Sequence, residues 1–230
     1  MELNDNEGDL IHYRSVSRAA MLALLLGLLS SLALVNTLLW ALPVVAIAVS
    51  LLAMRNLSTH STELVGRSAA IVGLAAAIFF GAWAPARDIS RSWLLQSQAK
   101  PLTDEFIDLF LSGKLHEAHQ LTLRPIQRQS RGTSLAAFYE NSDTAREQLK
   151  EFLAPEAPQI LLSLGNGAKV DSSRSSGINF QVNWHVGRQY TISNFQNKES
   201  VTINVVALRR TAKNTDHVTW EIVGLGIPPE

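Results

Sequence analysis

Apolar residues are concentrated in three runs in the first part of the chain, at residues 19–35, 38–54 and 68–84. Each run has 17 residues, which is within the range of helix lengths that cross a lipid bilayer. The alternative is a set of buried helices in a soluble protein, and three such runs in tandem are hard to hide in a chain of 230 residues. The pattern predicts a three-helix transmembrane domain at residues 19–84.

The first two runs are separated by only two residues, Asn36 and Thr37. One straight helix over both runs would be about 54 Å long, at about 1.5 Å per residue. The hydrocarbon core of a bilayer is only about 30 Å thick. We therefore predict a helical hairpin that turns near these two residues.

Charged residues avoid the same region. The whole chain has 20 basic and 20 acidic residues, of which three lie between positions 19 and 84: Arg55, Glu63 and Arg67. Basic residues beside membrane helices favour the cytoplasmic side, which predicts a cytoplasmic tail at 1–18. Three spans would then place the C-terminal region outside the cytoplasmic (inner) membrane. Arg87 and Arg91, which follow the third run, oppose this orientation.

Small residues recur at intervals of four in the first and third runs, where they form ridges that allow two helices to approach closely. These residues are Ala23, Gly27 and Ser31 in the first run, and Ala69, Gly73, Ala77 and Gly81 in the third. We expect the ridges to pack within one chain. A homo-oligomer interface is the alternative.

Three stretches of this region resemble a bacterial family of membrane-anchor domains of unknown function. They are ALLLGLLSSLAL (23–34), LPVVAIAVSLLAMRNL (42–57) and GRSAAIVGLAAAIFFG (66–81). One departure is Val49, where that family often has glycine. The resemblance implies a membrane anchor or scaffold, and it carries over no functional residues.

A juxtamembrane linker at 85–100 leads to a soluble region at 101–230. Its apolar spacing is first helical, with a helix that Pro101 opens and Thr103 caps, and with further helices at 115–121 and 134–152. Beyond Pro155 the spacing alternates, which predicts strands at 159–164, 178–185, 189–195, 201–209 and 218–224. Helices followed by strands with short polar links, among them 172–177, predict an α+β domain with an antiparallel sheet.

This order of elements resembles the superfamily of nuclear transport factor two and ketosteroid isomerase. The resemblance rests on FLSGKLHEAHQLT (110–122), LAAFYE (135–140) and the closing VTWEIVGLGI (218–227). It implies a curved, cone-like sheet that folds around the helices and leaves one pocket. A cystatin-like or other α+β sheet is the alternative.

Two groups of residues are candidates for a functional site, one for a metal site and one for a ligand pocket. His116 and His119 are spaced i, i+3, whereas the zinc-protease signature needs i, i+4, so we expect packing roles and no metal site. The polar side of the predicted strands offers five candidates to line a pocket: Asn183, His185, Tyr190, Asn204 and Glu221. The catalytic residues of ketosteroid isomerases cannot be matched to this chain, so we assign no catalytic residue.

Composition and motifs exclude several classes of protein. The chain has no cysteine, which excludes disulfides and thiolate metal sites. P-loop, dinucleotide-binding and G-x-S-x-G motifs are absent. Residues 85–230 carry 16 basic and 15 acidic side chains, which disfavours a nucleic-acid partner. No cofactor is expected.

These observations favour a multi-pass, membrane-anchored module that binds or assembles without catalysis. Its expected partners are the lipid bilayer and a protein, either another chain or a second copy. One alternative is a tethered cone-fold domain that binds or converts a small molecule. The other is a structural, oligomerising membrane protein.

Overall fold

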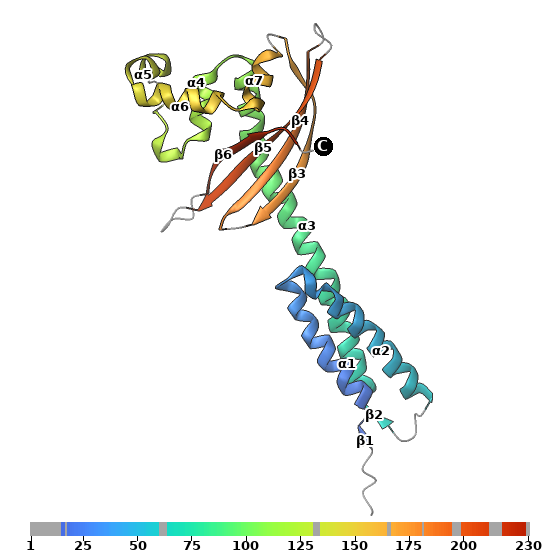
Figure 1. Ribbon diagram of the computed structural model, residues 1–230. Coiled ribbons are helices and arrows are strands. Elements are labelled where there is room, and N and C mark those ends of the chain that lie inside the picture. The colour runs from blue at the N-terminus through green and yellow to red at the C-terminus, as the bar shows by residue number, and fades with distance from the viewer. Residues whose placement is uncertain are drawn as a thin grey trace, which may run out of the picture. The chain divides into compact units, whose positions relative to one another are not determined.

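The computed structural model describes residues 15–16, 18–59, 64–130, 134–164, 167–180, 182–194, 199–211 and 218–228 (Figure 1). The chain divides into two compact units, residues 1–91 and 92–230. The division falls inside the predicted linker 85–100, which is helical. Helix α3 (Arg67–Leu111) contributes residues to both units.

The first unit is built from helices and one short strand pair. Helix α1 (Arg18–Leu29) continues into the 3-10 helix η1 (Ser30–Leu34), and the 3-10 helix η2 (Thr37–Trp40) leads into α2 (Ala41–Thr59). The strand pair is parallel and joins β1 (Ser15–Val16) to β2 (Leu64–Val65). The predicted turn is present at Asn36, whose side chain accepts a hydrogen bond from the Leu38 amide at 2.9 Å.

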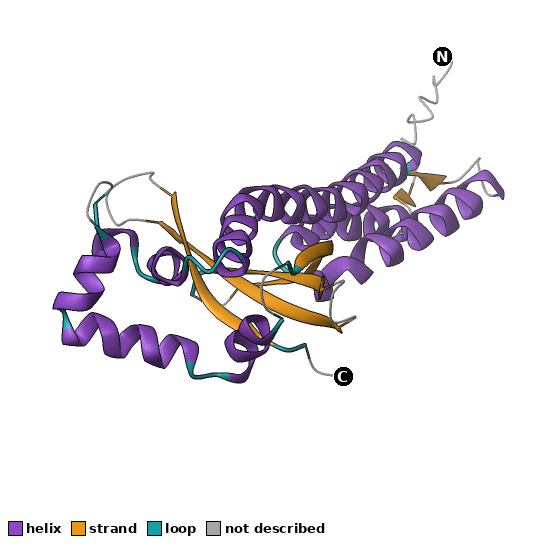
Figure 2. Ribbon diagram, turned by 90° about the horizontal axis from the view of Figure 1, so that it is seen from above, coloured by secondary structure: helices purple, strands orange, loops and turns teal. Residues whose placement is uncertain are grey.

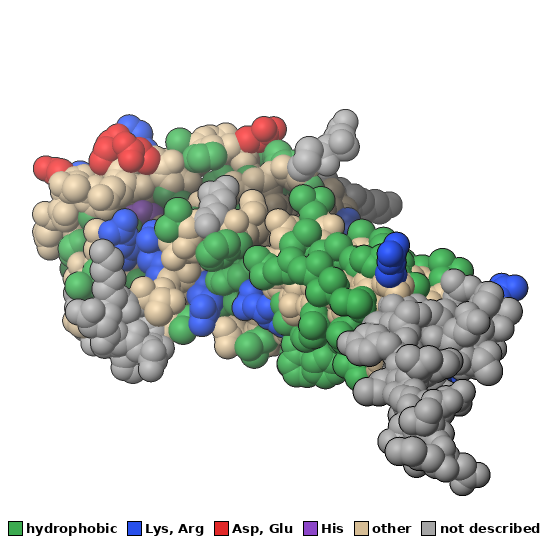
Figure 3. Space-filling model, turned by 90° about the horizontal axis from the view of Figure 1, so that it is seen from below, with side chains coloured by type: hydrophobic (Ala, Val, Ile, Leu, Met, Phe, Trp, Pro, Cys, Tyr) green, Lys and Arg blue, Asp and Glu red, His purple; other side chains and the backbone are tan. Residues whose placement is uncertain are grey.

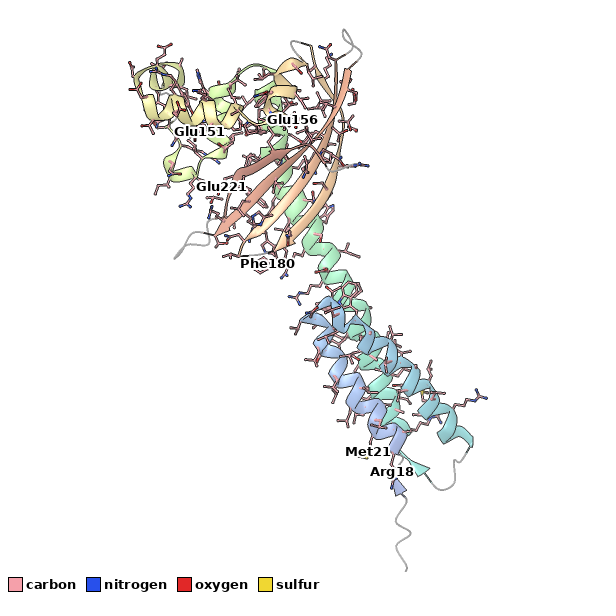
Figure 4. All side chains as sticks on the ribbon, in the orientation of Figure 1. Arg18, Met21, Glu151, Glu156, Phe180 and Glu221 are labelled. Atoms are coloured by element: carbon pink, nitrogen blue, oxygen red, sulfur yellow. The ribbon has the colours of Figure 1, made fainter. Side chains whose placement is uncertain are left out.

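Burial in the first unit is the reverse of that in a soluble bundle. Small residues such as Ala23, Ala46 and Ala77 are buried between the helices, while large apolar side chains such as Met21 and Phe79 are more than half exposed. Figure 4 marks Met21 beside Arg18 at the start of α1, and Figure 3 shows an extended green surface of hydrophobic side chains. Exposed apolar surface of this extent is typical of a face that meets lipid or a partner.

Two of the described helices are long and apolar enough to cross a membrane. They are the segment Thr37–Arg55 and helix α3, whereas the apolar segment Arg18–Leu34 is shorter.

The second unit has an α+β fold, as predicted. Over the described residues of the whole chain, seven α-helices precede a four-stranded antiparallel sheet of order β3-β4-β5-β6, and the second unit contains the end of α3, α4–α7 and this sheet (Figures 1 and 2). The helices after α3 are α4 (Leu115–Thr122), α5 (Leu135–Asn141), α6 (Asp143–Leu153) and α7 (Glu156–Ser163), with the 3-10 helix η3 (Pro125–Gln127) after α4. The strands are β3 (Lys169–Phe180), β4 (Trp184–Asn194), β5 (Glu199–Thr211) and β6 (Val218–Gly226).

One face of the sheet packs against the helices and forms the core of this unit. Alternate residues of the central strands face inward, including Val186, Tyr190 and Ile192 of β4 and their partners on β5. They pack against α3 through Phe106 and Phe110, and against α4 and α7. The aromatic rings of Phe106, Phe110 and Phe152 lie about 6 Å apart in this core.

Two of the predicted strand segments are wrong. Residues 159–164 lie in helix α7 and its C-cap, where Ala157, Pro158 and Leu161 are buried at helical spacing. Residues 178–185 do not form one strand, because the chain turns between β3 and β4 and pairs Phe180 with Trp184. The rings of these two residues are 4.7 Å apart. The polar segment 172–177, predicted as a link, belongs to β3.

Two of the predicted helix boundaries are also wrong. Helix α3 runs through Pro101, and the Thr103 hydroxyl bonds back to the Lys100 carbonyl at 3.0 Å instead of capping a new helix. The predicted helix 134–152 is divided at Ser142, whose hydroxyl accepts from the Ala145 amide at 3.3 Å and so caps α6. Serine is a favoured N-cap because its oxygen satisfies a free amide.

Candidate functional site

The five predicted pocket residues do not meet in one place. Tyr190 lies on the helix-packed face of the sheet, which it shares with Val186 and Ile192 because the three residues occupy alternate positions of β4. His185 and Glu221 both align with Leu208 of β5, so they share the opposite face.

The remaining two candidates lie elsewhere. Asn204 also lies on the opposite face and accepts a hydrogen bond from Ser176 at 2.5 Å, while Asn183 lies in the turn after β3. The expected shared pocket is therefore not formed, because the strand register puts Tyr190 on the other side of the sheet.

Tyr190 ties β4 to α3. Its side chain is 1% exposed, and its hydroxyl lies 2.7 Å from both the Thr103 hydroxyl oxygen and Asp104 Oδ1. Burial raises the pKa of Tyr190 to about 12, so the hydroxyl stays protonated at neutral pH and donates to the Asp104 carboxylate. The Arg188 guanidinium lies 5.9 Å from the centre of the same ring. The residue acts as a structural tie and is unsuited to proton transfer at neutral pH.

Glu221 is held by an ion pair on the outer face of the sheet. Its carboxylate is almost fully buried, and Oε1 accepts from Arg210 Nε at 2.7 Å and lies 2.6 Å from Nη2. The hydrogen bond to Glu221 raises the pKa of the Arg210 guanidinium. Figure 4 labels Glu221 on β6. Oε1 is engaged by Arg210, whereas Oε2 is buried without a hydrogen-bond partner among the described residues.

The two histidines of the HEAH segment belong to a buried cluster between α4 and α5. Gln120 Nε2 donates to the Tyr139 hydroxyl at 2.9 Å, and the Tyr139 oxygen lies 2.6 Å from His119 Nδ1. In the neutral tautomer of His119 that carries its proton on Nε2, Tyr139 donates its own proton to Nδ1. The His116 ring stacks on Tyr139 with centroids 4.6 Å apart.

The cluster stabilises the helices and leaves His119 neutral. Burial, and then the charge of His116, lower the pKa of His119. Burial also raises the pKa of Tyr139. Gln120 Oε1 accepts a hydrogen bond from the backbone amide of Gln129 at 2.8 Å, which holds the segment after η3 against α4. Within the described part of the chain, no group of three potential ligands is placed to hold a metal ion.

An apolar cavity of about 290 Å³ lies between β6 and the ends of the helices. Val223 has no pairing partner on β5, because Ile222 pairs with Ala207 and Gly224 with Val206, so the strand bulges there. The cavity is lined by Thr122, Phe152, Pro155, Pro158, Ile222, Val223, Gly224 and Leu225. Its volume is near the lower end of the range for ligand pockets, about 300 Å³.

The lining of this cavity suits binding rather than proton transfer. Its side chains are apolar apart from Thr122, whose hydroxyl already donates to the His119 carbonyl at 2.8 Å. Sequence reasoning missed the site, although Pro155 and Pro158 are signals of a bend there. A second hollow of about 480 Å³ lies beside α4, α5 and α6 and carries the charged side chains of Lys114 and Glu117.

Within the first unit, the small-residue ridges meet. A Cβ atom on Gly27 would lie 2.6 Å from the Cα of Gly73, and one on Gly81 would lie 3.1 Å from the Cβ of Pro43. Ala23 and Ala77 are buried, whereas Ser31 and Ala69 are partly exposed. The contact between Gly27 and Gly73 joins α1 to α3 inside one chain.

Comparison of the chain with protein-family models, with curated proteins and with solved structures gives no match. Both family resemblances noted in the sequence stay predictions.

Proposed function

We propose that this protein is a membrane-anchored binding module without catalytic activity, whose α+β domain takes an apolar group into the cavity at β6. The observation that carries the proposal is the cavity itself, with its apolar lining beside the bulge at Val223. No polar candidate residue among those described lines this cavity, and three titratable side chains are engaged elsewhere: Tyr190 by α3, His119 by Tyr139, and Oε1 of Glu221 by Arg210.

Anchoring is supported by the outward apolar faces of α1, α2 and α3. We propose a multi-pass anchor of three spans within residues 19–84, in which the shorter segment Arg18–Leu34 forms the first. The basic residues around the first two spans favour a soluble domain outside the cytoplasmic membrane. The cone-like curvature of the sheet that the second resemblance implies is part of the same proposal.

The absence of cysteine from the chain allows a single introduced thiol to report on the cavity. Val223→Cys places it at the cavity wall, and Val182→Cys places a control in the turn after β3, where Val182 is 87% exposed. The full chain in lipid nanodiscs is alkylated with and without saturating 1-octanol as the apolar probe. We expect octanol to slow the reaction of Val223→Cys several-fold and to leave Val182→Cys unchanged. Equal rates, or equal slowing at both positions, would contradict the binding proposal.

The same control variant tests orientation. A membrane-impermeant maleimide added to intact cells should label Val182→Cys before lysis. Labelling that appears only after lysis would contradict an extracytoplasmic domain. It would leave the proposal of a binding cavity unaffected, because that proposal does not depend on orientation.

A further inference from the structure

A small polar cavity lies at the turn between α1 and α2, entirely within the first unit. Its volume is about 120 Å³, and its walls are the end of η1, the residues Asn36 and Thr37, and one side of α3. Arg87, Asp88 and Arg91 of α3 line it, and Arg87 Nη1 donates to the Leu34 carbonyl at 2.8 Å. This bond fixes one guanidinium at the cavity wall.

The charges around the cavity suit an oxyanion. Arg87 and Arg91 are four residues apart and so lie on the same side of the helix. With Asp88 they give the lining a formal net charge of +1. A guanidinium has five N–H donors in a planar fork, so a bond to one carbonyl leaves Arg87 able to hold a phosphate through two parallel bonds. Thr37 and Trp40, whose side chains each carry a neutral donor, also line the cavity.

The sequence distance along α3 places this cavity at the depth of lipid headgroups. Arg67 opens α3, and Arg87 follows 20 residues later, which corresponds to about 30 Å of helix. That length matches the hydrocarbon core of a bilayer. Trp83 lies one turn before Arg87, is 53% exposed and stacks on Phe79. Tryptophan is enriched where membrane helices meet the headgroup region.

We propose that this cavity binds the phosphate group of an anionic phospholipid. The inference rests on the proposed membrane anchoring. Free phosphate has the same chemistry, but a cavity at interface depth faces a dense layer of lipid phosphates. A guanidinium binds a phosphate through charge-assisted bonds, and the net positive lining favours a lipid whose phosphate charge is not cancelled by an ammonium group.

The test compares lipids around the full chain in vesicles of phosphatidylcholine. Spin-labelled phosphatidylglycerol or spin-labelled phosphatidylcholine is added in trace amounts, and the motionally restricted fraction of each is measured. We expect the wild type to restrict phosphatidylglycerol several-fold more than phosphatidylcholine. We expect Arg91→Gln and the double variant Arg87→Gln/Arg91→Gln to lose this preference. Arg67→Gln, at the other end of the span, removes the same charge and should retain it.

The outcomes separate this site from the anchor. Arg87 also holds Leu34, so Arg91→Gln alone tests the site if the double variant misfolds. The headgroup proposal would be overturned if the wild type restricted phosphatidylglycerol and phosphatidylcholine equally. It would also be overturned if Arg91→Gln kept the wild-type preference for phosphatidylglycerol. If millimolar inorganic phosphate, added at constant ionic strength, abolishes the preference for phosphatidylglycerol, free phosphate is the ligand that the cavity selects. This result would overturn the proposal that the ligand is a lipid. A chain that fails to float with vesicles overturns the anchor itself.

Discussion

The hydroxyl of Tyr190 on β4 lies 2.7 Å from the carboxylate of Asp104 on α3. The two residues are 86 positions apart in the chain, and their contact fastens the central sheet to the helix that packs against it. Because the tyrosine is buried and the carboxylate is partly exposed, the charged partner remains hydrated while the neutral one is withdrawn from water.

Tyr190→Phe should lower the stability of the α+β unit. It removes a buried hydrogen bond to a charged group, for which we expect a loss of about 1.5–3 kcal/mol. Asp104→Asn should cost less, because the amide oxygen can still accept the bond. Urea unfolding of the full chain in nanodiscs, followed by tryptophan fluorescence, measures both. A larger loss in Asp104→Asn than in Tyr190→Phe would contradict this account.

The same tyrosine should make stability fall at high pH. Its folded pKa of about 12 lies above the unfolded value of 10.0, so the folded state holds the proton longer. This contribution to stability is complete below pH 10 and is lost as the pH rises from 10 to 12. Tyrosinate absorbance should show a hydroxyl that titrates near pH 12, in addition to the raised titration of Tyr139, and Tyr190→Phe should remove this component.

His119 should have the opposite effect at low pH. Its folded pKa lies below the unfolded value of 6.5, so the unfolded state binds a proton first as the pH falls. The contribution of His119 is therefore complete above pH 6.5 and declines below it. In the His116→Gln variant, one cause of the lowered pKa is gone, so the NMR titration of His119 should move upward. An unchanged titration would show that His116 exerts no such effect.

Gly73→Ala should destabilise the helical unit. A Cβ there would lie 2.6 Å from the carbonyl carbon of Ala23, which is backbone and cannot rotate away. Overpacking of this kind costs about 1–3 kcal/mol. Gly81→Ala is the matched control, because its Cβ would meet only the Pro43 side chain, at 3.1 Å. Thermal unfolding in detergent should show the larger loss for Gly73→Ala, and equal losses would contradict the close approach.

Arg128→Gln should weaken the attachment of the α4–η3 segment to the edge strand β6. The guanidinium donates to the Trp220 carbonyl at 2.9 Å, and also to the carbonyls of Leu121 and Leu123. Hydrogen exchange should quicken in the α4–η3 segment and along β6. Arg124→Gln, at an exposed site on the same segment, is the control. Exchange that is unchanged in Arg128→Gln would mean that the arginine does not hold this edge.

Periodic burial explains which strands were found. Alternation predicted segments of β4, β5 and β6, because one face of each is buried in the core. The segment 172–177 was missed because both faces of the edge strand β3 are exposed, so its serines carry no alternating signal. The segment 159–164 is apolar on adjacent positions, which does not distinguish a strand from a helix, and in the structure it forms the end of α7 and packs into the core.

The sequence by itself determined that three apolar runs precede an α+β region, because hydropathy and its period are local properties. It did not predict the lining of the cavity at β6, which shares no residue with the five predicted pocket candidates. The tertiary structure alone decided that Tyr190 and Glu221 lie on opposite faces, since the pairing of strands sets the face of each residue. It also decided where the apolar cavity opens, because that cavity needs a bulge in β6 and two prolines far from it in the chain.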